Sequence, residues 1–155
     1  MMIGIDMTYN LPNDTLHNAL IQSEQDLLNS EKIKFSFDRK WTSNFPEKPG
    51  VYAIFDKSKL LYIGESANLK ERMKELKRTY NHSFRKKLGG IHFNGKIGKN
   101  KKYSDKIEQM MNEFYTKNVY LSFIEVNFGR IEIESFLIDK FNDKILNSKK
   151  KRKGK

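Results

Sequence analysis

Cysteine is absent from this chain of 155 residues. Its absence excludes a disulfide scaffold, a thiolate zinc site and a cysteine nucleophile. The sequence also has no run of about 18 apolar residues and no basic segment followed by an apolar run at its start, so we expect neither a membrane span nor a secretory signal. The three histidines are scattered and form no metal-binding motif. We therefore expect a soluble protein of a reducing compartment, the cytoplasm, without an organic cofactor.

Positive charge is the strongest feature of the composition. The chain has 30 basic and 19 acidic residues, a formal net charge of +11. Residues 1–44 are slightly acidic, whereas residues 70–102 hold twelve basic residues against two acidic ones and residues 149–155 hold six basic residues and no acid. Neutralising phosphates releases condensed counterions, so this charge predicts a nucleic-acid partner. The alternative is an ordinary solvated surface, and a membrane surface is less favoured because the basic stretch lacks a sustained apolar face.

The length supports one domain with a single core. The proline- and glycine-containing segment FPEKPG, residues 45–50, is typical of a loop. It separates a helical N-terminal extension, residues 1–44, from a main domain, residues 45–147. We expect a basic insertion at residues 73–118 and a disordered basic tail at residues 148–155. Periodicity predicts helices over residues 14–28, 68–78, 82–88, 104–118 and 131–141, and strands over residues 33–37, 51–55, 60–63 and 119–126. This order indicates an α+β fold with a small antiparallel sheet covered by helices.

Two tyrosines, Tyr52 and Tyr62, lie on the paired strands of the predicted hairpin, and Arg72 lies in the helix that follows. A tyrosine in a strand is most often a packing residue, and an arginine in a helix is most often on the surface. Glu134 is harder to explain structurally, because helical spacing places it on one face with Ile131 and Ile138. A carboxylate on an apolar face needs a partner, either a salt bridge or a metal ion.

The basic block from Arg78 to Lys87 interleaves cations with aromatic residues, a composition suited to phosphate and groove contacts. We expect Arg85 to contact a base, because an arginine fork reads guanine. The alternative is an amphipathic helix with Phe84 and Leu88 turned inward. The residues expected to contact DNA are Arg78, His82, Arg85, Lys86, Lys87, Lys99, Lys101 and Lys102.

Three separated segments resemble the GIY-YIG nuclease superfamily. Residues 49–54 read PGVYAI, residues 61–72 read LYIGESANLKER, and residues 134–138 read ESFLI, in the order and with the spacing typical of that family. The resemblance covers residues 50–147. It implies a three-stranded antiparallel sheet flanked by helices, and hydrolysis of phosphodiester bonds with Mg²⁺ or Mn²⁺.

The resemblance also implies roles for individual residues. Tyr52 is expected to be the base that activates water, with Tyr62 orienting it, while Arg72 stabilises charge on the phosphate and Glu134 binds the metal. A tyrosine can act as the base only where nearby cations favour its phenolate. One carboxylate is enough for Mg²⁺, which keeps much of its water shell.

The sequence departs from the family pattern in two places. The family often has a histidine four residues after the arginine, where this chain has Leu76, and His82 is the nearest candidate to replace it. Asp143 stands where the family has a closing proline, and Asn147 lies one residue beyond the position of the family asparagine. His82 and Asn147 complete the expected catalytic set.

The function predicted from these features is a stand-alone, sequence-specific endonuclease of double-stranded DNA, most like the small restriction enzymes of the superfamily. Cutting both strands of a symmetric site favours a homodimer. One alternative is a phage-type or DNA-repair nuclease of relaxed specificity. The other is a non-cleaving nucleic-acid-binding module on the same fold, although such a module does not need Tyr52, Tyr62, Arg72 and Glu134 together.

Overall fold

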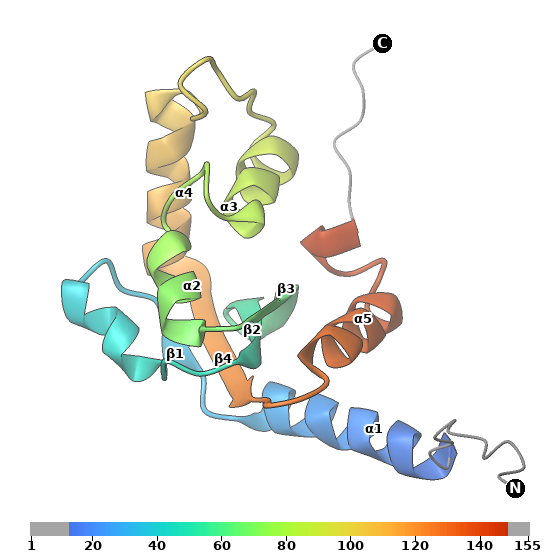
Figure 1. Ribbon diagram of the computed structural model, residues 1–155. Coiled ribbons are helices and arrows are strands. Elements are labelled where there is room, and N and C mark those ends of the chain that lie inside the picture. The colour runs from blue at the N-terminus through green and yellow to red at the C-terminus, as the bar shows by residue number, and fades with distance from the viewer. Residues whose placement is uncertain (1–12, 149–155) are drawn as a thin grey trace, which may run out of the picture.

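A computed structural model describes residues 13–148 and shows a twisted antiparallel sheet between two layers of helices (Figure 1). The strands are β1 (Ile33–Lys34), β2 (Gly50–Asp56), β3 (Lys59–Ser66) and β4 (Val119–Glu125), in the order β1-β4-β2-β3. All three pairings are antiparallel. The α+β prediction is confirmed. The sheet has four strands rather than three, because the two-residue β1 from the N-terminal extension pairs with the edge of β4.

The helices follow the predicted order. They are α1 (Asn13–Asn29), η1 (Arg39–Asn44), α2 (Leu69–Glu75), α3 (Ser83–Lys87), η2 (Leu88–His92), α4 (Asp105–Asn118), α5 (Arg130–Lys140) and η3 (Leu146–Ser148). The side chain of Asn68 accepts from the backbone N–H of Glu71 and begins α2, and Ser104 begins α4 in the same way. The short loop Lys57–Ser58 joins β2 to β3, with Lys57 in the left-handed conformation.

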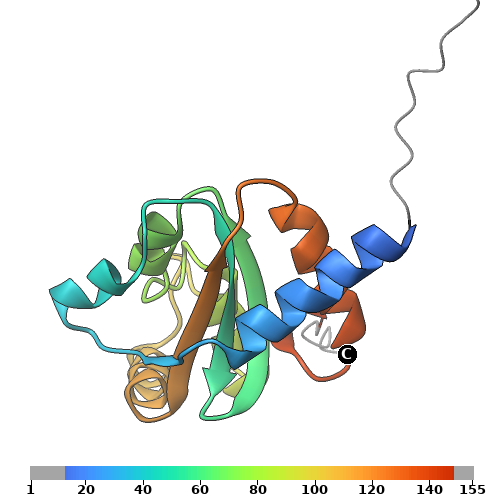
Figure 2. The same cartoon turned by 90° about the horizontal axis from the view of Figure 1, so that it is seen from below.

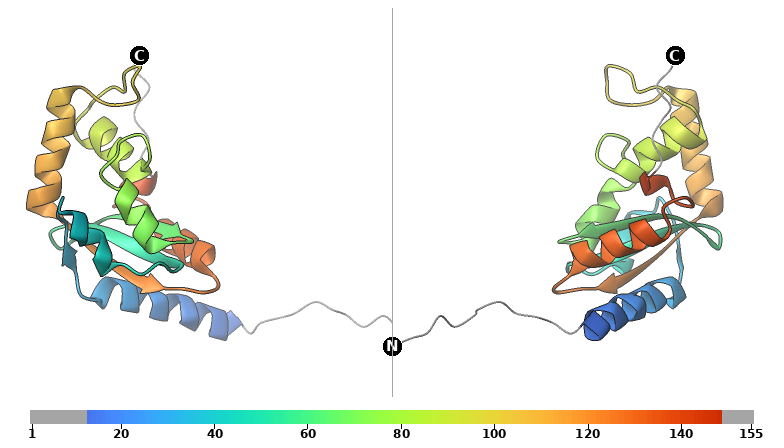
Figure 3. Two further views of the ribbon diagram at one scale, coloured as in Figure 1. Left: turned by 60° about the vertical axis from the view of Figure 1, so that its left-hand side comes forward. Right: turned by 90° about the vertical axis from the view of Figure 1, so that its right-hand side faces the viewer.

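The sheet separates two hydrophobic cores. On one face, Tyr52, Ile54 and Tyr62 pack against α2, α3 and α4, and on the other face Val51, Ala53 and the adjoining residues pack against α1 and α5. Figures 2 and 3 show α1 lying across the second face and α2, α3 and α4 stacked over the first. The central strand β2 is therefore buried on both faces, which explains its nearly continuous apolar sequence.

The second short helix, α3, ends near residue 88 as predicted, and a turn of π-helix, η2, then continues the chain to His92. One local prediction is wrong. The apolar face of α5 is not the one predicted from spacing: Ile131 is 56% exposed, and the buried residues are Ile133 and Leu137. Spacing shows which residues share a face of the helix but not which face meets the sheet, and the face that packs in the second core carries Ile133 and Leu137.

The N-terminal segment contributes to the same core as the strands. Leu27 of α1 is fully buried, and the Ser122 hydroxyl of β4 donates to its backbone carbonyl at 2.7 Å. The predicted boundary at residue 44 remains a prediction. The basic tail, residues 149–155, lies outside the described residues. Within residues 13–148, no helix has the length and apolar character needed to cross a membrane.

Candidate active site

The two tyrosines lie on the same face of the β2–β3 hairpin. Tyr52 is opposite Gly64 in the strand ladder and Tyr62 is opposite Ile54, and the ring centroids of the tyrosines are 6.4 Å apart. Gly64 is required for this arrangement, because a Cβ on it would lie 2.3 Å from the Tyr52 hydroxyl oxygen. Both tyrosines are almost completely buried. The glycine of the second signature segment therefore makes room for the side chain of the first.

The first turn of α3 contacts both tyrosine hydroxyls. The Nε2 atom of His82 is 2.9 Å from the Tyr52 oxygen, and the Ser83 hydroxyl is 2.5 Å from the Tyr62 oxygen. His82, expected to replace the family histidine, is thus brought to Tyr52 from a different helix. Sequence reasoning missed Ser83. The available signal was its position directly after His82, at the start of a short helix.

The surroundings of His82 determine which of its nitrogens carries the proton. The backbone N–H of Phe84 donates to Nδ1 at 3.1 Å, so His82 is also the N-cap of α3. A neutral imidazole whose Nδ1 accepts carries its proton on Nε2. Burial, and then the positive charge of Arg72, lower the pKa of His82 well below its ordinary value. Neutral His82 therefore donates to the Tyr52 oxygen and cannot accept the proton of Tyr52 at that nitrogen.

Arg72 reaches the same site from α2. Its Nη1 donates to the Glu75 carboxylate at 2.6 Å and to the backbone carbonyl of Asn81 at 3.0 Å. The second bond fixes the turn that precedes His82. Arg72 is partly exposed, with a side-chain accessibility of 26%, so the guanidinium is held in place but remains open to a ligand on one side.

The electrostatic environment of the tyrosines combines burial with this one cation. Burial, and to a lesser extent Tyr62, raise the pKa of Tyr52 far above its ordinary value, while the charge and hydrogen bond of Arg72 lower it. Burial also raises the pKa of Tyr62, and the hydrogen bond from Ser83 opposes this. Both side chains are therefore neutral phenols here. Arg72 and the Nε2–H of His82 are the groups placed to stabilise a phenolate on Tyr52.

Glu134, on α5, is a half-buried carboxylate at the edge of this site. Burial and the neighbouring Glu65 carboxylate raise the pKa of Glu134, while a hydrogen bond from the Glu65 backbone and the charge of Arg72 lower it. Glu65 itself is paired with Arg130, whose Nε lies 2.6 Å from its carboxylate. Glu134 also acts electrostatically on both Tyr52 and Tyr62. The carboxylate therefore belongs to the same electrostatic cluster as the tyrosines.

The donor set around Glu134 fits a hard divalent cation held by few protein ligands. A carboxylate destabilised by a second carboxylate gains from a nearby cation. Within residues 13–148 there is no group of three or more histidine, cysteine, aspartate or glutamate side chains able to hold a metal. A cation at Glu134 would thus take its other ligands from water and the substrate, as Mg²⁺ commonly does.

Asn147 has a structural position. Its side-chain amide accepts from the backbone N–H of Ile63 at 2.9 Å and donates to the backbone carbonyl of Ile63 at 2.6 Å. Asn147 thereby occupies one ladder position on the open edge of β3, next to Tyr62. Its own backbone carbonyl accepts a hydrogen bond from Lys87 of α3. Both polar atoms of the side chain are used by the strand, so Asn147 positions β3 instead of presenting its amide to a substrate.

Two of the residues expected to contact DNA are buried, so their contact with DNA stays a prediction. Arg85 is only 2% exposed, and His82 is fully buried. Arg85 donates from Nε to the Thr79 hydroxyl at 3.1 Å and from Nη2 to the Asn112 side chain at 2.8 Å, so its fork binds other parts of the protein. Its cation also lies over the ring of Tyr115, at 5.1 Å from the centroid. The structure therefore makes Arg85 a link between α3 and α4.

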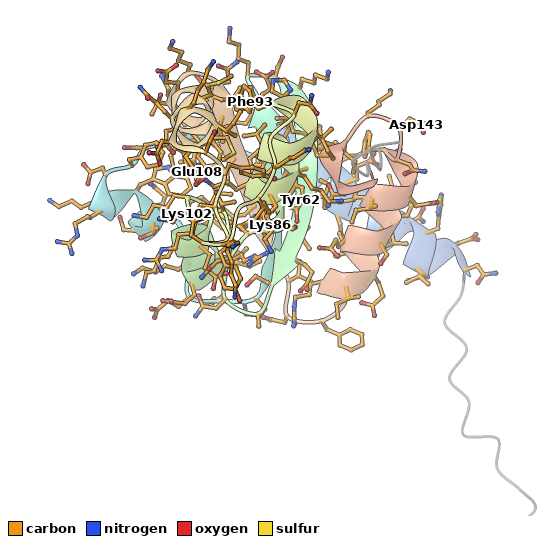
Figure 4. The ribbon with its side chains drawn as sticks, turned by 90° about the horizontal axis from the view of Figure 1, so that it is seen from above. Tyr62, Lys86, Phe93, Lys102, Glu108 and Asp143 are labelled. Atoms are coloured by element: carbon orange, nitrogen blue, oxygen red, sulfur yellow. The ribbon has the colours of Figure 1, made fainter. Side chains whose placement is uncertain are left out.

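The other expected DNA contacts are accessible to different degrees. Lys86 and Lys87 are half-buried, while Arg78, Lys99, Lys101 and Lys102 are exposed. Figure 4 shows Lys86 and Lys102 on the side of the molecule formed by α3 and α4, and Asp143 on the far side beyond α5. Among the residues expected to contact DNA, the four exposed ones all lie in the predicted insertion, residues 73–118.

Comparison with known protein families gives a match over most of the chain. A family model described as the GIY-YIG catalytic domain matches residues 42–154, a span that includes both tyrosines, Arg72, His82 and Glu134. No curated protein and no solved structure matches the chain significantly.

Proposed function

Because the chain belongs to the GIY-YIG nuclease superfamily, we propose that it is a divalent-metal-dependent endonuclease that hydrolyses phosphodiester bonds of double-stranded DNA. The observation that carries this proposal is the environment of the Tyr52 hydroxyl. His82 lies 2.9 Å from it, and the charges of Arg72 and, more weakly, Glu134 act on it. A purely structural tyrosine has no need of these three groups around it.

Tyr52 is the proposed base. To accept a proton from the attacking water, its oxygen must carry negative charge, and burial opposes that charge. Two donors offset this opposition, the Arg72 guanidinium and the Nε2–H of His82. His82 acts here as a fixed hydrogen-bond donor, because its Nδ1 accepts from the backbone of Phe84. Tyr62, held by Ser83 beside Tyr52, orients the water.

Before the reaction, Tyr52 gives its phenol proton to solvent water. Hydrolysis then joins the attacking water oxygen to phosphorus and breaks one P–O bond, while the proton of the attacking water passes to the Tyr52 oxygen and the departing oxygen takes a proton from solvent. Arg72 is partly exposed and fixed by Glu75 and Asn81, so it is placed to bind a non-bridging oxygen of the phosphate. Glu134 would hold the divalent cation. When bound, that cation supplies positive charge that stabilises the transition state and the departing oxygen.

Sequence specificity and the oligomeric state are further parts of the proposal. The exposed cations Arg78, Lys99, Lys101 and Lys102 support DNA binding by the insertion at residues 73–118. Restriction-type cleavage at a symmetric site would call for two copies of the chain, one for each strand. We assign the nuclease domain to residues 45–147 and treat residues 1–44 as an extension, of which the described part, residues 13–44, packs on the domain.

The test is cleavage of unmethylated supercoiled plasmid with Mg²⁺, Mn²⁺ or EDTA, followed by gel electrophoresis. Discrete fragments are expected with the metals and none with EDTA. A smear would indicate relaxed specificity, and intact plasmid under every condition would indicate a binding module. Tyr52→Phe removes only the hydroxyl, so cleavage should fall by at least ~100-fold, the lower bound typical of a lost general base, with an unchanged circular dichroism spectrum.

A further inference from the structure

A hollow of about 570 Å³ lies in the basic insertion, on the outer side of the turn that carries His82. Its walls include Tyr80, Asn81 and Arg85 from the α2–α3 segment, Lys101 and Lys102 from the following loop, and Glu108 from α4. Pockets that hold small organic ligands have volumes of about 300–1,000 Å³. The hollow is therefore of a size suited to a compact organic group rather than to a single ion.

The rim of the hollow is cationic and carries an exposed aromatic ring. Tyr80 is 55% exposed, although its ring is a large apolar surface. The Nζ atoms of Lys101 and Lys86 lie 4.3 and 5.5 Å from the centroid of this ring. Single-stranded nucleic-acid sites combine an exposed ring with cations, so that a base stacks on the ring and the cations bind the backbone. A base stacked on Tyr80 would take the place of one of the two lysines that lie over the ring.

The inner wall has a different chemistry. The Glu108 carboxylate accepts from the Thr79 hydroxyl at 2.7 Å and lies 3.7 Å from Nη2 of Arg85. Asn112, whose amide oxygen accepts from Arg85, also faces the hollow. A bare phosphate placed deep in the hollow would meet this carboxylate and be repelled. A nucleobase edge carries both donors and acceptors, so it matches a wall that offers a carboxylate, an amide and a guanidinium.

Arg85 provides an independent observation. Its side chain is only 2% exposed at this wall, yet within residues 13–148 its Nη1 atom has no hydrogen-bond partner. A buried guanidinium N–H without an acceptor is rare, because leaving it unpaired is unfavourable. Nη1 has less than 1 Å² of accessible surface, so a carbonyl oxygen or ring nitrogen of a nucleobase would reach it only after a small shift of this wall.

We propose that this hollow binds one unpaired nucleotide of the DNA substrate, with the base stacked on Tyr80 and facing Glu108 and Arg85, and the phosphate on Lys101 and Lys102. The proposal rests on the proposed function, since it names a feature of the same substrate. The hollow adjoins the candidate active site: Asn81 lines it, while the carbonyl of Asn81 accepts from Arg72. A nucleotide that leaves the DNA double helix near the cut phosphate could thus bind in this hollow. Unstacking it would cost a few kcal/mol.

The test compares binding of three labelled duplexes by fluorescence anisotropy, in EDTA so that no cleavage occurs. The first duplex is fully paired, the second has one bulged deoxyadenosine, and the third has a bulged abasic nucleotide at the same place. The abasic duplex keeps the phosphate and the bend but lacks the base. Wild-type protein should bind the adenosine bulge roughly 5- to 140-fold more tightly than the abasic bulge, the range expected for one stacked base.

Variants of Tyr80 locate the effect. Tyr80→Phe keeps the ring and should keep the preference for the adenosine bulge, whereas Tyr80→Ala should abolish it and leave the affinity for the fully paired duplex the least changed of the three. Phe128→Ala is the matched control, because Phe128 is also an exposed aromatic, at 95%, but lies in the β4–α5 loop. Thermal melts of each variant confirm that it is folded.

The outcomes separate the two proposals. Equal binding of the adenosine and abasic bulges by wild-type protein, or a preference that survives Tyr80→Ala, would overturn the nucleotide pocket, and so would a failure to bind any of the duplexes. Plasmid cleavage with Mg²⁺ would then still support the proposed function. A base-dependent preference that disappears in Tyr80→Ala, found together with no cleavage under any metal condition, would support the pocket and overturn the nuclease.

Discussion

Replacing His82 by asparagine should change how the stability of the protein depends on pH. His82 is fully buried, and burial together with Arg72 holds its pKa well below the ordinary value of about 6.5. As the pH falls through 6.5, the unfolded chain takes up a proton at this position and the folded protein does not. Protonation therefore stabilises the unfolded state. The free energy of unfolding falls progressively as the pH drops below 6.5, and it stops falling through this group once the pH reaches the lower pKa that His82 has in the folded protein.

The magnitude follows from the linkage relation. If the folded protein takes up no proton at His82 over this interval, the free energy of unfolding falls by about 1.4 kcal/mol between pH 7.5 and 5.5 through this group alone. Asparagine does not titrate, and it is a good N-cap, so His82→Asn keeps an acceptor for the backbone N–H of Phe84. Because other titrating groups are common to both proteins, the difference between them isolates His82.

The assay is urea unfolding of wild-type protein and His82→Asn at pH 7.5, 6.5 and 5.5. The variant should be the less stable protein at pH 7.5, because it no longer bonds to Tyr52, and the gap should close by about 1.4 kcal/mol at pH 5.5. His92→Asn is the control, since it removes an exposed histidine of the same region. A gap that stays constant with pH, or widens in acid, would refute the assignment of His82 as a buried neutral donor.

Three other substitutions or deletions test separate parts of the structure. Gly64→Ala should destabilise the protein by about 1–3 kcal/mol in urea unfolding, since the new Cβ would meet the Tyr52 ring. Gly98→Ala is the control and should not destabilise it, because a Cβ there would lie 3.5 Å from the nearest atom; equal effects would contradict the close approach of Gly64 to Tyr52. Arg85→Ala should cost about 3–5 kcal/mol of stability in urea unfolding, because it removes the buried cation that joins α3 to Glu108 and Asn112 of α4; an unchanged stability would contradict this structural role. Deleting residues 149–155 removes six positive charges. The slope of log affinity against log salt concentration should become shallower by about 0.9 for each phosphate contact that is lost, while the sequence preference persists. An unchanged slope would exclude the tail from DNA binding.

The sequence predicted those parts of the site that depend on local pattern. The pairing of the strands that bear Tyr52 and Tyr62 follows from a short polar loop between two apolar runs, and the β2–β3 hairpin confirms it. The predicted starts of two helices, at residues 68 and 104, also agree with the structure, where the side chains of Asn68 and Ser104 cap α2 and α4, because capping depends on the neighbouring backbone alone. A local interaction leaves a local signature in the sequence.

The errors concern residues whose environment is set from a distance. Arg85 lies in a basic run and looks like a surface residue, but Thr79, Glu108 and Asn112 surround it only after α3 packs on α4. The error at Ile131 has the same origin, because the packing of α5 against β2 and β3 decides which of its faces is buried. Helical periodicity specifies which residues share a face, but it does not specify which face becomes buried.

That His82 replaces the family histidine remains a proposal. Leu76, at the family position, has a fully buried apolar side chain in the first hydrophobic core, so it offers no polar group to Tyr52. The Tyr52 oxygen instead receives its donor from His82, whose Nδ1 is engaged by the first turn of α3.

The hydrogen bond from His82 to Tyr52 depends on the position of α3, and other residues of the insertion hold α3 in that position. Arg85 ties α3 to α4, and Arg72 ties the turn at Asn81 to α2. The same turn carries Tyr80 on its outer side and His82 on its inner side. A nucleotide bound on the outer side would thus restrict the residues that hold Tyr52. Under the two proposals, nucleotide binding and the loss of the Tyr52 proton would therefore be coupled through this one short turn of the chain.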